Sequence, residues 1–161
     1  MTALLRFLFF LLLIAGLAGC TKPPSPASAN APVAKHEHHP PHGGTPVVLG
    51  TELYHLELVL DASTGRLSAY VLDGEMENFV RIAAPSLEIT ATVNGQPHSL
   101  VLAAVANPAT GESVGSTSLF ETQADWLKTT KEFDAVLAKI EVRGTTFTAV
   151  AFNFPKGNDQ D

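Results

Sequence analysis

Apolar and polar residues alternate one by one through most of the chain after residue 46, and this pattern restricts the fold more than any other feature. Alternation places successive side chains on opposite faces of an extended strand, whereas a helix face needs apolar residues three and four positions apart. The clearest example is Ser86–Asn94, in which every second residue is apolar. Asn94-Gly95 then favours a two-residue hairpin turn, because both residues tolerate positive φ. We expect the segment 98–104 to return as the partner strand.

The same pattern predicts two further hairpins. In Leu53–Asp61 one face carries Tyr54, Leu56, Leu58 and Leu60, and the other, polar face carries His55, Glu57 and Asp61. A turn over 61–65 joins this run to a second alternating run at 67–72. Arg143-Gly144 separates the runs 138–142 and 145–154 in the same way.

One region fits two patterns. Between residues 126 and 140 large apolar residues recur three and four positions apart, as on a helix, while 136–142 alternates as a strand does. We expect a short helix near Asp125–Thr130 and a strand from about Phe133. The fold prediction is therefore all-β: an antiparallel, immunoglobulin-like β-sandwich of about seven or eight strands with one short helix.

Residues 1–19 have the composition of a secretory signal peptide. Arg6 supplies a positive charge, an apolar run follows, and small residues precede Cys20. The apolar stretch of about twelve residues is well short of the roughly 20 that span a bilayer. Leu17-Ala18-Gly19-Cys20 resembles the lipobox of bacterial lipoproteins, which implies cleavage before Cys20 and acylation of its thiol. An ordinary signal peptide, or a short membrane anchor, is the alternative.

The organisation of the mature chain follows from composition. We expect a Pro-, Ala- and Ser-rich tether over 20–35 and a flexible His-rich arm over 36–45. The β-sandwich domain is expected over 46–155, and a disordered tail over 156–161. Lipid attachment would place the protein on the cell membrane or the outer membrane, facing the periplasm.

Charge and cysteine content limit the kinds of partner and the cross-links that the chain can have. The formal net charge of −6, which becomes −7 once Arg6 is removed, disfavours binding to nucleic acid or to anionic lipid. Attachment to the membrane therefore depends on the acyl chains. Cys20 is the only cysteine, so the folded domain contains no disulfide.

Four histidines within seven residues form the most distinctive cluster of the chain: His36, His38, His39 and His42. Imidazole is the commonest metal-binding side chain, and short His-rich tracts are typical of metal binding. Pro40 and Pro41 exclude a helix here, and Gly43-Gly44 lets the chain fold back. His55 is a further candidate ligand, although a surface role is the simpler interpretation. A hydrophilic linker that is incidentally rich in histidine remains the alternative for the whole tract.

The types of metal-binding side chain in the sequence limit which metal ion the chain could bind. Cu(I) prefers sulfur, but the mature chain has a single methionine and its cysteine is expected to be acylated. Imidazole with carboxylate suits Zn(II), Cu(II) or Ni(II), and the intrinsic affinity order favours Cu(II) over Zn(II) at an unselective site. We expect Cu(II) or Zn(II), and no organic cofactor. Gly111–Gly115 fits the G-x-S-x-G pattern of a hydrolase nucleophile, but it lacks the required strand before it and helix after it. We therefore do not expect an enzyme.

The segment HEHHPPHGG, followed by VVLGTELYHLELVLD, resembles the His-rich N-terminal region of periplasmic adaptor subunits of heavy-metal efflux pumps. It is also similar to small His-rich exported lipoproteins with the same arrangement. The resemblance covers residues 36–73 and implies a ligand set of His36, His38, His39 and His42, with His55 as an additional ligand. The chain has no long heptad-patterned hairpin and is too short for an adaptor's several domains.

Two functions remain open from the sequence. The first is a lipoprotein that buffers Cu(II) or Zn(II), or delivers it to a partner in metal efflux. The second is a structural or interaction module that binds another envelope protein and carries an incidental His tract.

Overall fold

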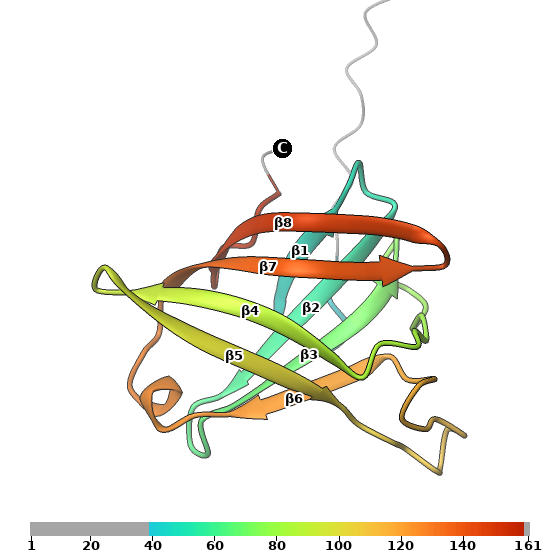
Figure 1. Cartoon of the computed structure of the whole chain (residues 1–161), viewed down its shortest axis with the longest axis horizontal. Coiled ribbons are helices and arrows are strands. Elements are labelled where there is room, and N and C mark those ends of the chain that lie inside the picture. The colour runs from blue at the N-terminus through green and yellow to red at the C-terminus, as the bar shows by residue number, and fades with distance from the viewer. Residues whose placement is uncertain (1–38, 160–161) are drawn as a thin grey trace, which may run out of the picture. The chain divides into compact units, whose positions relative to one another are not determined.

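The structure, a computed structural model, describes residues 39–159, which belong to one compact unit. The described residues form eight strands and one short 3₁₀ helix, η1 (Asp125–Lys128), and Figure 1 shows how these elements are arranged. The strands are β1 (Thr45–Leu49), β2 (Tyr54–Asp61), β3 (Arg66–Asp73), β4 (Ser86–Val93), β5 (Gln96–Ala104), β6 (Leu119–Gln123), β7 (Phe133–Val142) and β8 (Thr145–Phe154). The prediction of an antiparallel all-β fold with one short helix is confirmed.

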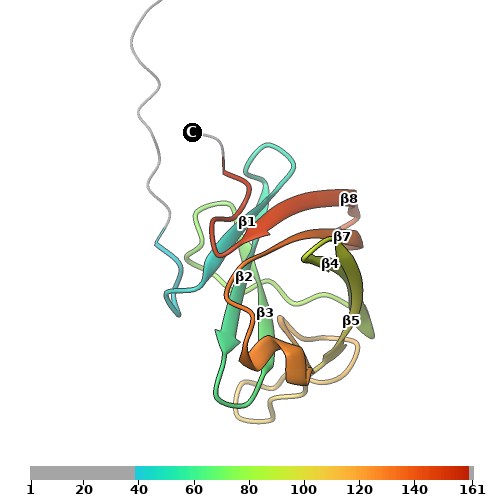
Figure 2. The ribbon, with the colours of Figure 1, turned by 90° about the vertical axis from the view of Figure 1, so that its left-hand side faces the viewer.

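All eight strands belong to one antiparallel sheet, in the order β1-β2-β3-β6-β5-β4-β7-β8. The side view in Figure 2 shows how the sheet curls, with β1, β2 and β3 on one side and β4, β5, β7 and β8 facing them. The two layers of the expected sandwich are therefore parts of one continuous sheet. β6 joins them, because it pairs with β3 along one edge and with the end of β5 along the other.

The predicted turns close two of the hairpins. Asn94 and Gly95 have φ values of 50° and 76°, and Arg143 and Gly144 have values of 48° and 83°. These are the positive values that a two-residue hairpin turn needs for its twist to match that of the strands. The ambiguous region divides as expected, into η1 followed by β7.

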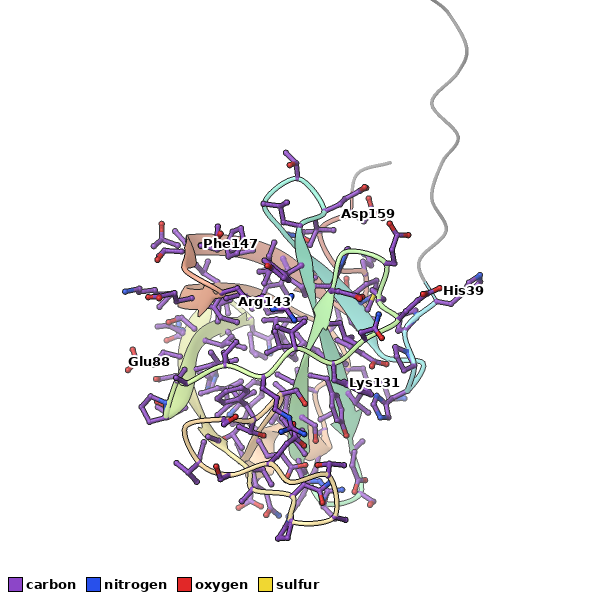
Figure 3. All side chains as sticks on the ribbon, turned by 90° about the vertical axis from the view of Figure 1, so that its right-hand side faces the viewer. His39, Glu88, Lys131, Arg143, Phe147 and Asp159 are labelled. Atoms are coloured by element: carbon purple, nitrogen blue, oxygen red, sulfur yellow. The ribbon has the colours of Figure 1, made fainter. Side chains whose placement is uncertain are left out.

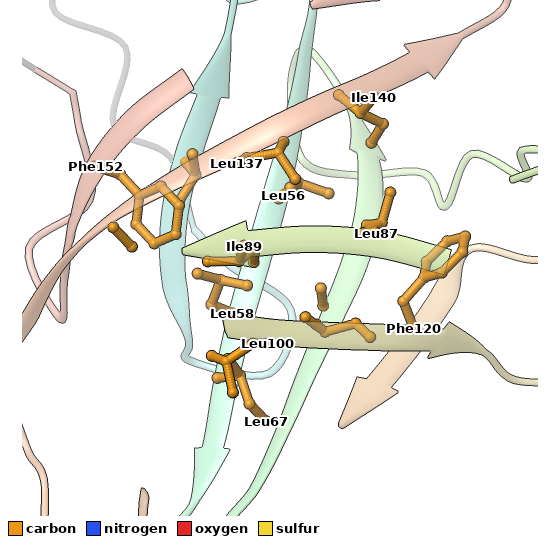
Figure 4. Packing of buried hydrophobic residues seen from close by; sticks show 14 of the residues in the cluster. Leu56, Leu58, Leu67, Leu87, Ile89, Leu100, Phe120, Leu137, Ile140 and Phe152 are labelled. Atoms are coloured by element: carbon orange, nitrogen blue, oxygen red, sulfur yellow. The ribbon is translucent and has the colours of Figure 1, made fainter. Parts of the chain in front are cut away.

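The core lies between the facing layers and is built from alternating positions. In β4, Leu87, Ile89 and Ala91 are buried, and the intervening side chains are exposed. Figure 4 shows Leu87 and Ile89 packed against side chains of the opposite layer, such as Leu56 and Leu58. Burying one side chain of this size stabilises the fold by about 1.5–3 kcal/mol.

β2 departs from the expected alternation. His55 and Glu57 belong to the predicted polar face, yet both are fully buried. The outer face of β2 is covered because main-chain groups at residues 42 and 44 bind the Glu57 carboxylate. The Asp73 carbonyl oxygen likewise lies 3.2 Å from His55 Nδ1. The polar residues on this face of β2 are thus buried against specific polar partners.

The C-terminal boundary of the domain lies beyond residue 155. Asn158 hydrogen-bonds both main-chain groups of Val48, accepting at 2.7 Å and donating at 3.2 Å. Gly157 pairs with Asn153, and Lys156 forms an ion pair of 2.9 Å with Glu132. Residues 156–158 of the predicted tail therefore belong to the fold, where Asn158 covers part of the free edge of β1. Such covering protects an edge strand from pairing with other chains.

Within residues 39–159 no helix has the length and apolar character needed to cross a membrane.

Candidate metal site around His42

The site is built on Glu57, a carboxylate in the middle of β2. Its side chain is 0% exposed and lies between two buried leucines of the same strand. Burying a charged carboxylate is costly unless hydrogen-bond donors surround it. The donors come from the segment just before β1.

A tight turn brings that segment onto Glu57. The Gly43 N–H donates to the Pro40 carbonyl oxygen at 2.9 Å. The His42 and Gly44 main-chain N–H groups then donate to Glu57 Oε1 at 2.7 and 2.9 Å. His42 Nδ1 lies 2.8 Å from Glu57 Oε2. Three contacts thus join the end of the His tract to one buried side chain.

The absence of a side chain at Gly44 makes this close approach feasible. An alanine Cβ at this position would lie 2.5 Å from the Leu58 carbonyl oxygen and 2.8 Å from Glu57 Cγ. Real Cβ contacts are essentially never that short, so the segment would have to move away from β2. Gly43 has open space around it but adopts a φ of +66°, which favours glycine for a different reason. The His-Gly-Gly sequence therefore holds the imidazole in place.

The contact with Glu57 determines the tautomer of His42. A carboxylate only accepts hydrogen bonds, so Nδ1 carries the proton and donates it. In the neutral ring the lone pair is then on Nε2, which makes no hydrogen bond with any of residues 39–159. The side chain is 37% exposed. A histidine oriented by a carboxylate through one nitrogen is the usual arrangement of a metal ligand that binds through the other.

Two aromatic rings complete the surroundings of His42. Tyr70, which lies opposite Glu57 in β3, stacks on the imidazole with a centroid distance of 4.0 Å and an interplanar angle of 17°. Phe79 is 49% exposed and lies 5.8 Å from the imidazole, centroid to centroid. Partial burial, followed by the nearby carboxylates of Glu121 and Glu57, raises the pKa of Tyr70. The rings restrict the imidazole to one orientation.

The predicted ligands do not all meet in the structure. His42 is held at the surface, and His39 is exposed three residues before it. His55 is buried on β2 with Nδ1 beside the Asp73 carbonyl oxygen, which removes it from the surface where the tract ends. His36, His38 and Cys20 lie outside the described residues. Residues 39–159 contain no group of three His, Cys, Asp or Glu side chains arranged to hold a metal ion.

Glu57 and Tyr70 are the site residues that sequence reasoning missed. Glu57 interrupts an apolar run between Leu56 and Leu58, and a charged residue in such a place is a signal for a buried partner. The identity of that partner depends on tertiary structure, since His42 lies 15 positions away. Tyr70 becomes a neighbour only through the register of β2 with β3.

Ser113, the central residue of the G-x-S-x-G pattern, does not occupy a strand-to-helix turn. It is exposed and lies in an irregular segment where its N–H donates to the Ser116 carbonyl oxygen at 3.1 Å. The arrangement of a hydrolase nucleophile is not formed around it.

No protein-family model, curated protein or solved structure matches this chain.

Proposed function

We propose that the chain is an exported lipoprotein, attached through Cys20, that binds Cu(II) or Zn(II) with His42 as its fixed ligand. It buffers the metal outside the cytoplasm or passes it to an envelope partner, without chemical turnover. The observation that carries this proposal is the hydrogen bond between His42 Nδ1 and the buried Glu57 carboxylate, which leaves Nε2 as the metal-binding nitrogen.

The fixed imidazole gives the His tract a defined end. A ring whose orientation is already set loses less conformational freedom when it binds a metal than a ring on a free chain does. His36, His38 and His39 supply the further nitrogens in this proposal, since the described domain does not complete a site by itself. A set of nitrogen ligands binds Cu(II) more tightly than Zn(II) by intrinsic affinity.

Calorimetric titration tests the metal site. The soluble chain from Thr21 onwards is titrated with Cu(II) and with Zn(II), alongside His42→Ala and a variant with His36, His38 and His39 all replaced by alanine. Both variants should lose most of the affinity. His98→Ala is the matched control, because it removes a histidine from β5 and should leave the binding constants unchanged.

The competing function, an interaction module with an incidental His tract, predicts a different outcome. Metal affinity would then be weak in the native chain and equally weak in both tract variants. Lipid attachment is tested separately by the mass of the membrane-extracted protein, which should carry acyl chains and should lose them in Cys20→Ser. Retention of the full precursor mass in the native protein would contradict the lipoprotein proposal.

A further inference from the structure

The hairpin of β7 and β8 bends halfway along its length. In β7 the alternation of buried and exposed residues is interrupted where Ala138 and Lys139 are both exposed. Opposite this point, Ala149 of β8 has a φ of 51°, outside the range of regular strands. The register is unchanged on either side, with Leu137 opposite Val150 and Lys139 opposite Thr148. The bend therefore turns the end of the hairpin without adding a residue to either strand.

β4 does not follow this bend. Its pairing with β7 runs from Thr92 opposite Asp134 to Ile89 opposite Leu137 and stops there. Figure 1 shows the two strands lying together at one end and separating towards the other. A cavity of about 780 Å³ opens between them, with the segment 81–84 along its side. Glu88 of β4 and Arg143 at the end of the hairpin both line this cavity, and Figure 3 labels them in a view from this end of the domain.

Unpaired main-chain groups of two strands face this gap. In a two-residue hairpin the residues that flank the turn hydrogen-bond to each other, and the direction then alternates along each strand. In β7, this alternation starts at the turn 143–144. The main-chain groups of Lys139 and Glu141 therefore point away from β8. In β4, the alternation starts at the turn 94–95, so the main-chain groups of Ser86 and Glu88 point away from β5. The pairing of β4 with β7 ends at Ile89 opposite Leu137, so among the described residues Ser86, Lys139 and Glu141 have no partner residue across the gap.

The chemistry of these groups specifies what can occupy the gap. Main-chain donors and acceptors spaced along a strand are satisfied best by another extended chain, as in strand addition to an open sheet edge. Charges of both signs line the gap: Lys139 and Arg143 are on one side, with Glu141 between them in sequence. Lys139 and Arg143 form no ion pair with the described residues, so they are available to an incoming carboxylate.

We propose that the gap between β4 and β7 binds an extended segment of another protein, which pairs antiparallel with residues 139–141 of β7. Antiparallel pairing is the more stable of the two arrangements. In that direction a basic side chain of the segment lies beside Glu141, and an acidic one two residues later lies beside Lys139. The occupant is thus a strand with a basic-x-acidic order on its exposed face. This surface is separate from the His42 site and does not depend on metal binding.

A labelled peptide tests the proposal on the soluble chain from Thr21 onwards. The probe is fluorescein-Thr-Val-Thr-Lys-Val-Glu-Thr-Val-Thr-amide, and the comparison peptide has its Lys and Glu exchanged. Fluorescence anisotropy should show saturable binding of the probe and weaker binding of the exchanged peptide. Equal binding of the two peptides would refute the charge order, and no binding of the probe would refute the proposal.

Proline substitutions distinguish main-chain recognition from nonspecific binding. Lys139→Pro and Glu141→Pro each remove an N–H directed into the gap and should weaken binding about tenfold. Thr146→Pro is the matched control, because Thr146 lies opposite Glu141 in the same hairpin but directs its N–H to the other edge of β8. Lys139→Ala, which keeps the main-chain donor, should weaken binding less than Lys139→Pro. Thermal melting checks that all four variants fold.

Amide hydrogen exchange locates the bound strand. Binding should slow exchange at Ser86, Glu88, Lys139 and Glu141, whereas protection confined to other residues would overturn the proposal. A concentration-dependent dimer with protection at these four amides would replace the partner segment by a second copy of the chain. If these amides are protected without peptide in the chain from Thr21, and lose that protection in a chain from Lys35, the occupant is the chain's own N-terminal segment.

Discussion

Replacing Gly44 with alanine tests the architecture of the His42 site directly. The added Cβ would lie 2.5 Å from the Leu58 carbonyl oxygen and 2.8 Å from both Glu57 Cγ and Val59 Cγ2. The carbonyl belongs to the middle of β2 and cannot move, so the segment before β1 must shift. That shift breaks the donors to a carboxylate that is 0% exposed.

The expected loss of stability follows from the hydrogen bonds that the shift breaks. Each hydrogen bond to a charged group contributes about 1.5–3 kcal/mol, and a buried charge left without partners costs about 3–5 kcal/mol. Water can enter where the segment moves away, so we expect the free energy of unfolding to fall by about 3 kcal/mol for Gly44→Ala. This is a large part of the roughly 5–15 kcal/mol that stabilises a typical domain.

Gly43→Ala is the matched control, because it adds the same methyl group one residue earlier. Nothing lies within 4 Å of that Cβ, so only the φ of +66° is unfavourable, and the cost should be about 1 kcal/mol. Urea unfolding followed by Trp126 fluorescence measures both changes, since this residue, the only tryptophan, is half-buried against Phe133. Equal destabilisation by the two substitutions, or a smaller effect at Gly44, would refute the reasoning.

Three further predictions concern carboxylates. Glu57→Gln should lower Cu(II) and Zn(II) affinity about 10–100-fold in calorimetry, because the amide no longer orients His42 as a carboxylate does; unchanged affinity would contradict the proposed role. Burial acts to raise the pKa of Glu112, but hydrogen bonds from Ser118 outweigh it and the net pKa is lowered. The stabilisation by ionised Glu112 is therefore present above the ordinary glutamate pKa and is lost as the pH falls through the pKa of Glu112 in the folded protein. Glu112→Gln should consequently flatten the acid side of a plot of melting temperature against pH. Hydrogen bonds from Ser63, followed by those from Thr64, lower the pKa of Asp61 to about 2, and an NMR titration of Ser63→Ala should show this pKa rising part of the way towards 3.8.

Local patterns predicted several elements of this fold correctly. The alternation in Ser86–Asn94 corresponds to β4, and the pairs at 94–95 and 143–144 form the expected turns. The change from η1 to β7 near residue 130 was also predicted. Each of these depends on side-chain periodicity or on the φ preferences of adjacent residues, which neighbouring residues in the sequence are enough to define.

Longer-range features were not predictable in this way. The position of β6 between β3 and β5 depends on how the whole sheet curls, and nothing within Leu119–Gln123 specifies it. The burial of His55 depends on Asp73, 18 residues away. Asn158 was assigned to a disordered tail because its partner, Val48, is 110 residues distant.

The sequence by itself determined an exposed-and-buried alternation, two tight turns and a His tract that ends in His42-Gly43-Gly44. Only the tertiary structure decided what these residues do together. Glu57 becomes the anchor of His42 because β2 presents it where the turn from Pro40 returns, and Gly44 is required because the two segments touch there. The physical reason is that a buried charge selects its donors by position in space, and that position is set by the packing of the complete sheet.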